Sequence, residues 1–241
     1  EFVEAEADIR AIHLAKNLET PLYIVHLANE EGAAAVTKAR DEGYDIIAET
    51  CPQYLQFTSD VYKREDGRNF VCSPPIKGEE SRNALWDALR RGDISVVATD
   101  HCPFQSFEKD WGKDDFTKIP NGCGGIEQMY PYMLSAAGEG KITYEKAVEV
   151  CAANPARLFG CTGKGSIAVG KDADIVLYDP ALDYTVTAAA SNSNCDHTIW
   201  EGTKLTGYPV QTWLRGNLVY DRGEFLGKPG DGRFIRRALR K

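Results

Sequence analysis

The sequence has 241 residues, of which 43% are hydrophobic and 27% are charged, a balance typical of a globular protein that can bury a sizeable core. Its 28 basic and 36 acidic residues give a net charge of −8, which argues against a general nucleic-acid-binding protein. No apolar run approaches the roughly 20 residues that a membrane-spanning helix needs. We therefore expect a soluble cytoplasmic protein with neither nucleic acid nor membrane as a partner.

Over the first hundred residues, segments with apolar residues at helical spacing alternate with short apolar runs that are typical of buried strands. The predicted helices are at 3–17, 30–42 and 79–91, and the predicted strands are at 22–26, 45–49 and 94–99. Asn29 precedes the second helix and is its predicted N-cap, because an Asn side chain accepts a hydrogen bond from the first turn. Such alternation is typical of parallel α/β sheets and barrels.

The next part of the chain is a long polar loop followed by helical segments. Residues 104–125 are rich in Gly and charged residues, and a loop of this length beside a strand end is usually functional. Helices are predicted near 126–137 and 143–152. A further short helix is predicted from Pro155, with Asn154 as its cap, because Pro is favoured at the first helical position.

Beyond this point the pattern becomes that of a β structure. Short strand-like runs, the first at Ile167, are separated by Gly, Asp, Pro and Asn, which predicts a small β segment over about 163–230. We therefore divide the chain into a strand–helix part at 1–160 and a β segment with a C-terminal tail at 161–241.

Two polar side chains stand where apolar strands end. The run at 94–99 leads directly into Asp100, and the strand at 22–26 closes with His26. In barrels built from βα units, the residues past the C-terminal ends of the strands form the active-site floor, so Asp100 is a candidate active-site residue. Imidazole and carboxylate are common ligands of zinc and similar divalent ions. Two ligands do not define a metal site, so supporting or core roles stay open for both side chains.

Two loops contain long motifs, Thr-Asp-His-Cys-Pro-Phe at 99–104 and Asp-Asp-Phe-Thr-Lys-Ile-Pro-Asn-Gly at 114–122. Together with the segments at 23–26, 71–75, 154–160 and 170–176, they closely resemble the dihydropyrimidinase and D-hydantoinase family of the amidohydrolase superfamily. The Asp-His turn within the first motif and the Gly-Lys-Asp-Ala-Asp segment at 170–174 are shared with dihydroorotases and allantoinases. The second is the narrower signal and favours a dihydropyrimidinase or hydantoinase.

This resemblance implies a (β/α)8 barrel with two metal ions, usually zinc, that hydrolyses a cyclic amide or ureide to an N-carbamoyl amino acid, as in pyrimidine catabolism. By match to the motifs, His26 is implied as a metal ligand, and Asp100 as both a metal ligand and the catalytic general base. Ser73 and Asn121 are implied to bind the substrate, largely through their backbones. Family members are commonly homotetramers, so we expect that assembly here.

The chain also departs from the family pattern. None of its four histidines forms a His-x-His pair, and no counterpart is found for the lysine that bridges the two metals in the family. A full barrel takes about 250 residues, whereas we identify three barrel strands before the β segment. We therefore expect the C-terminal half of a TIM-like barrel, followed by a small β-sandwich segment.

Two consequences follow from a half-barrel. The isolated chain is predicted to bind metal weakly and to be inactive, because it would offer two of the family's ligands and expose unpaired strand edges.

The alternatives to a dihydropyrimidinase or hydantoinase are a non-catalytic dihydropyrimidinase-like scaffold that has lost its metals and a related cyclic amidohydrolase such as an allantoinase.

Overall fold

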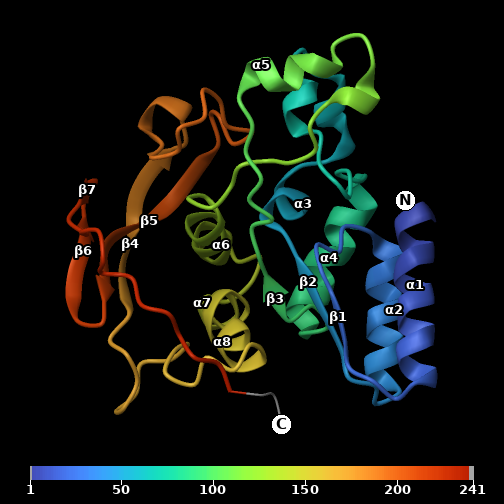
Figure 1. Ribbon diagram of the computed structural model, residues 1–241, viewed down its shortest axis with the longest axis horizontal. Helices are drawn as coiled ribbons and strands as arrows, with labels where there is room; N and C mark the ends of the chain where they lie inside the picture. Colours follow the sequence, from blue (N-terminus) through green and yellow to red (C-terminus); the bar gives the residue numbers. More distant parts are fainter. Residues whose placement is uncertain (1, 239–241) are drawn as a thin grey trace. The chain divides into compact units, whose positions relative to one another are not determined.

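The computed structural model describes residues 2–238, which form two compact units (Figure 1). The first unit contains the chain up to Met129 together with Val186–Thr203, and the second contains Tyr130–Thr185 and the chain from Lys204 onward. The segment boundary placed at residue 160 stays a prediction. In the described part of the chain, no helix combines the length and the apolar character that crossing a membrane requires.

The first unit is built on a parallel three-stranded sheet in the order β1-β2-β3. Its strands are β1 (Leu22–Ile24), β2 (Ile46–Thr50) and β3 (Val96–Val97). Tyr23 pairs with Ile47 and Glu49 pairs with Val96, so all three strands run in one direction. The predicted strands are confirmed in place, although β1 and β3 are shorter than their apolar runs suggest.

Three helices belong to the same unit, namely α1 (Phe2–Asn17), α2 (Glu30–Asp41) and α4 (Glu79–Arg91), as predicted (Figure 1). The Oδ1 atom of Asn29 accepts a 2.6 Å hydrogen bond from the backbone N–H of Gly32, which confirms Asn29 as the cap of α2. The core between helices and sheet is apolar, and its fully buried members include Val36, Leu85 and Leu89. This packing holds the strand ends in place.

Short helical turns occupy the stretches that the sequence indicates as loops. They are too short to produce a recognisable hydrophobic period, which is why pattern reading misses them. In the first unit these turns are α3 (Pro52–Gln56), η1 (Ser59–Lys63), η2 (Gly67–Phe70), α5 (Ser106–Lys109), η3 (Asp110–Gly112), η4 (Phe116–Lys118) and η6 (Ala188–Ala190).

Helix α6 (Met129–Gly138) leads into the second unit, where a helical run continues from residue 144 to residue 158 as α7 (Tyr144–Val148), η5 (Glu149–Ala153) and α8 (Asn154–Leu158). Asn154 has helical backbone angles, φ −65° and ψ −48°, so its predicted role as a cap is wrong. The reason is that the preceding turn, η5, widens into a π-helix and leads directly into Pro155.

An antiparallel sheet in the order β4-β5-β6-β7 completes the second unit. Its strands are β4 (Ile175–Thr185), β5 (Lys204–Leu214), β6 (Asn217–Asp221) and β7 (Glu224–Phe225). Ile167 is outside these strands, so the strand predicted there is wrong. The fold is therefore α/β, with one parallel and one antiparallel sheet, while its description as a half-barrel with a sandwich segment remains a prediction.

Candidate active site

His26 and Asp100 both lie just past the carboxyl edge of the parallel sheet, beyond β1 and β3. The backbone pairing continues to that edge: the N–H that follows His26 donates to the carbonyl of Glu49 at 2.8 Å, and the N–H of Ala98 donates to the carbonyl of Thr50 at 3.0 Å. Because parallel strands end on the same side of a sheet, the two predicted site residues emerge at one edge, with the end of β2 between them.

Both residues have left-handed backbone conformations, with φ 41° at His26 and φ 45° at Asp100. The other non-glycine residues with positive φ in the described chain are Glu19, Arg215 and Arg222. Such a conformation costs on the order of 1–3 kcal/mol and is concentrated at functional sites. Backbone strain therefore marks both strand ends that the sequence singles out.

Asp100 adjoins two further loops that are joined to its own by backbone hydrogen bonds. The N–H of Cys102 donates to the carbonyl of Cys123 at 3.1 Å, and the N–H of Gly122 donates to the carbonyl of Val71 at 3.0 Å. Gly122 has φ 152°, and a Cβ there would lie 2.4 Å from the carbonyl oxygen of Cys102. Only glycine permits this approach, so the three loops form one closely packed group beside the sheet edge.

Ser73 and Asn121, the predicted substrate-binding residues, are brought together by these loops. The Oγ atom of Ser73 donates a 3.0 Å hydrogen bond to Oδ1 of Asn121, and both residues are exposed. Within the described chain, their backbone N–H and C=O groups make no hydrogen bonds. The backbone N–H and C=O of each residue are therefore free to bind a ligand, in loops that are bonded to the loop that begins at Asp100.

A buried thiol, Cys51, follows β2 at the same edge. Burial, together with the charges of Glu49 and Asp100, raises the pKa of the Cys51 thiol well above its ordinary value. A thiol in this state stays neutral at physiological pH and is a poor nucleophile and metal ligand. Cys51 therefore adds neither a thiolate nucleophile nor a thiolate ligand at this edge.

A metal ion of the kind that the family resemblance implies needs more donors than these two. Zinc sites in proteins have at least three protein ligands, and residues 2–238 contain no group of three or more His, Cys, Asp or Glu side chains able to hold an ion. His26 and Asp100 are therefore two donors of the kind that bind zinc, and they do not by themselves complete a metal centre.

Sequence patterns gave no signal for Lys109, the last residue of α5. Its side chain is buried, with 1% exposure, and its Nζ donates to the backbone carbonyls of Val71 at 3.0 Å, Pro120 at 2.6 Å and Gly122 at 2.8 Å. Burial lowers the pKa of this lysine. Such a residue is found only by knowing the path of the loops around it.

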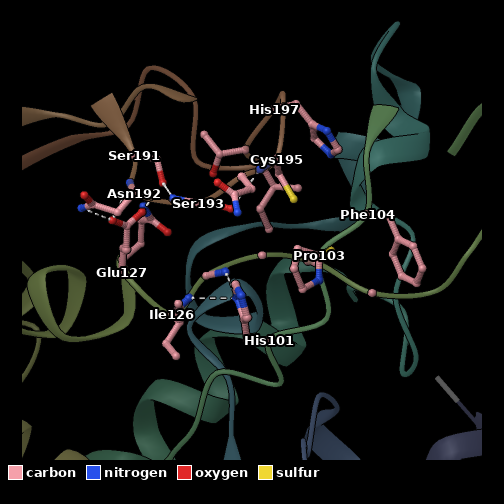
Figure 2. Close-up of a pocket in the computed structure, with 18 of the residues that line it drawn as sticks. His101, Pro103, Phe104, Ile126, Glu127, Ser191, Asn192, Ser193, Cys195 and His197 are labelled. Carbon is pink, nitrogen blue, oxygen red and sulfur yellow. Dashed lines mark hydrogen bonds between the residues drawn. The ribbon is translucent and has the colours of Figure 1, made fainter. Parts of the chain in front are cut away.

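His101 supports the neighbouring loop, as Figure 2 shows. Its Nδ1 atom accepts hydrogen bonds from the backbone N–H groups of Gly125 at 3.1 Å and Ile126 at 3.3 Å. The ring therefore fixes the backbone beside a cavity of about 440 Å³. None of the four predicted site residues lines this cavity, whose walls include Phe104, Glu127, Asn192, Cys195 and His197 (Figure 2).

Residues 16–219 match the model of the amidohydrolase family. The chain belongs to this family. Among curated amidohydrolase relatives, it is 42% identical to a D-hydantoinase of Streptomyces coelicolor over 98% of its own length and 52% of the relative's. It is 41% identical to a D-phenylhydantoinase of Escherichia coli over 97% of its length and 52% of that protein's. The chain thus spans about half the length of the curated relatives that it matches.

Solved structures agree with this assignment to the amidohydrolases. The crystal structure of a dihydropyrimidinase from Brevibacillus agri superposes with a TM-score of 0.94 at 36% identity, covering 97% of this chain and 52% of that one. An L-hydantoinase (dihydropyrimidinase) from Arthrobacter aurescens gives a TM-score of 0.91 at 35% identity, with the same coverage of 97% and 52%. The resemblance to dihydropyrimidinases and hydantoinases is confirmed.

Proposed function

We propose that this chain supplies one part of the active site of a hydantoinase-type enzyme that opens the ring of a cyclic amide or ureide. The observation that supports the proposal is the bonding of the loop that begins at Asp100, at a strand end, to the loops of Ser73 and Asn121, two exposed residues whose backbone N–H and C=O groups are free. The names of the relatives support the substrate class, because they are hydantoinases and a dihydropyrimidinase.

Asp100 acts as the general base in this proposal. Its carboxylate is exposed at the sheet edge and accepts a proton from the attacking water as the new C–O bond forms at the ring carbonyl. The same carboxyl group then delivers this proton to the ring nitrogen as the C–N bond breaks, and from a hydantoin or dihydropyrimidine the product is an N-carbamoyl amino acid. Water is consumed, and the carboxylate is regenerated.

Ser73 and Asn121 hold the ring in place. A cyclic ureide presents alternating N–H and C=O groups along one edge, and the backbone N–H and C=O of a residue supply the complementary donor and acceptor. The free backbone groups of these residues can therefore bind the ring edge while the reacting carbonyl faces Asp100. Such binding orients the substrate, which is a large part of rate enhancement in a two-reactant step.

His26 and Asp100 are this chain's proposed share of a metal site, most readily for zinc, with the other ligands supplied from outside residues 1–241. The three parallel strands belong, in this account, to a (β/α)8 barrel, and residues 161–241 belong to a β-sandwich segment. A homotetramer, a role in pyrimidine catabolism and a cytoplasmic location remain predictions. A metal at this edge would serve to polarise the scissile carbonyl and to activate water.

The test is to express this chain together with the part of the Streptomyces coelicolor D-hydantoinase that it does not match, and to assay the purified assembly. We expect release of N-carbamoyl product from hydantoin or dihydrouracil, and no turnover by the 241-residue chain alone. Hydrolysis of allantoin that is faster than that of hydantoin and dihydrouracil would favour the allantoinase alternative. A well-formed assembly that hydrolyses none of the three would contradict the proposal and favour the scaffold alternative.

A further inference from the structure

Lys109 is a buried cation held by neutral groups alone. Its ammonium group contacts three backbone carbonyls, and no carboxylate in the described chain forms an ion pair with it. Burying a charge costs far more than burying an apolar side chain of the same length. A methionine would fill this space at lower cost, so the position of the ammonium group calls for a reason beyond packing.

The three carbonyls that Lys109 contacts belong to the two loops that carry the proposed substrate-binding residues. Pro120 and Gly122 lie immediately before and after Asn121, and Val71 lies two residues before Ser73. One Nζ atom therefore fixes both loops at once. The backbone bond from the N–H of Gly122 to the carbonyl of Val71, 3.0 Å long, reinforces this junction.

Because peptide units are planar, these hydrogen bonds also determine the directions of the N–H and C=O groups of Asn121. In a planar trans peptide the C=O and N–H bonds point in opposite directions. Because the carbonyl of Pro120 points inward to Lys109, the N–H of Asn121 points away from it. Likewise, because the N–H of Gly122 points to Val71, the carbonyl of Asn121 points the other way. Both backbone groups of Asn121 are thereby aimed away from the buried ammonium.

The contact also affects the strength of the Asn121 donor. A carbonyl that accepts a hydrogen bond from a cation is polarised, and the N–H of the same peptide unit becomes a better donor. The carbonyl of Pro120 accepts from Nζ at 2.6 Å, the shortest of the three contacts. The N–H of Asn121 is therefore both oriented and strengthened by Lys109.

The backbone of Lys109 is itself anchored. At the start of α5, the N–H of Gln105 donates to Oε2 of Glu108 at 2.7 Å, and the N–H of Ser106 donates to Oδ1 of Asp196 at 2.9 Å. The ring of Phe104 lies 5.2 Å from Nζ and closes one side of its site. The cation is thus held at a fixed point relative to both loops.

We propose that Lys109 is a positioning residue, which aims the peptide groups of Asn121 at the ring edge of the substrate and fixes their distance from Ser73. This inference rests on the proposed function. Lys109 touches no reacting atom, so its effect is on substrate binding. Loss of its charge is expected to weaken binding while leaving the proton transfers of Asp100 nearly unchanged.

The first test measures the kinetics of Lys109→Met in the assembly described above, with Lys113→Met, an exposed lysine on the same loop, as the matched control. We expect KM for hydantoin to rise at least about tenfold and kcat to change less than about threefold, with no change in Lys113→Met. If Lys109→Met does not fold, Lys109→Gln, whose amide can still donate to two carbonyls, takes its place with a smaller rise. A wild-type KM in the folded variant overturns the proposal.

A second measurement on the 241-residue chain does not depend on activity. We expect hydrogen exchange of the Lys109→Met variant to accelerate at least about tenfold at the hydrogen-bonded amides of Val71 and Gly122, with β1, β2 and β3 unchanged. Unchanged exchange in the two loops, or acceleration throughout the chain, overturns the positioning role. If the assembly opens no cyclic amide, the proposed function fails. The exchange rates in the two loops still test whether Lys109 holds them in place.

Discussion

Ser73 and Asn121 are 48 positions apart in the sequence, yet Oγ of Ser73 donates a 3.0 Å hydrogen bond to Oδ1 of Asn121. The contact exists because their loops are joined by backbone bonds and by the buried ammonium of Lys109. It brings together two residues that motif resemblance alone had named.

Gly122→Ala should destabilise the first unit by about 2–4 kcal/mol. The new Cβ would lie 2.4 Å from the carbonyl oxygen of Cys102, so one of the two loops must move. Gly43→Ala is the matched control, since Gly43 also has positive φ, at 89°, but a Cβ added there would have no atom within 4 Å; it should cost about 1 kcal/mol. Urea unfolding measures the free energy of unfolding of both variants. Equal losses would contradict the close approach of the Cys102 carbonyl to Gly122.

Asp8→Asn should change how stability depends on pH. Burial, with a smaller contribution from the charge of Glu4, raises the pKa of Asp8 from 3.8 to about 6. The folded state thus holds this proton more tightly than the unfolded state, so its contribution is present below pH 3.8 and is lost as pH rises to about 6. The Asn variant should gain stability relative to the wild type at pH 7 but not at pH 3.5, as measured by urea unfolding at both values. A difference that does not vary with pH would contradict this reasoning.

Asn29→Ala should lower the free energy of unfolding by about 0.5–2 kcal/mol through loss of the α2 cap. The side chain is buried and also donates from Nδ2 to Oδ2 of Asp8 at 3.1 Å, so the larger end of that range is expected. Asn17→Ala, at the exposed end of α1, is the control and should cost less than about 0.5 kcal/mol. Thermal unfolding distinguishes them, and a neutral Asn29→Ala would refute the capping role.

Cys102 should react first with a thiol reagent. It is the one exposed cysteine of the described chain, whereas Cys51, Cys72 and Cys123 are buried. Burial raises the pKa of the Cys151 thiol to about 12, which further slows its reaction. We expect a single fast phase with DTNB that disappears in Cys102→Ser and persists in Cys151→Ser. A fast phase that survives in Cys102→Ser would contradict the assignment of this phase to Cys102.

Local patterns were sufficient to predict the strand–helix alternation, because β1 and β2 lie in short apolar runs and α4 has apolar residues at helical spacing. They also placed His26 and Asp100 at strand ends, where polar side chains have no packing role. The prediction of Asn154 as a helix cap was wrong. Proline usually marks the start of a helix, whereas here the π-helical turn η5 allows Pro155 to lie within a longer helical run. Regular elements are encoded locally, and this exception depends on the turn before it.

The fine structure of the site was beyond sequence patterns for a different reason. Lys109 is one lysine in a polar loop, and its role depends on carbonyls that approach from two other loops. The left-handed conformations of His26 and Asp100 likewise do not follow from residue type, since Asp and His adopt positive φ more often than most residues but are usually found at negative φ. Such features arise from long-range packing, which a local pattern does not record.

The kcat of Asp100→Asn for ring opening of hydantoin, in the assembly with the complementary part of the Streptomyces coelicolor D-hydantoinase, tests the central claim most directly. His13→Asn, on the exposed side of α1, is the control. The account predicts a fall in kcat of at least about a hundredfold for Asp100→Asn, with His13→Asn unchanged. A folded Asp100→Asn assembly with wild-type kcat would contradict the account.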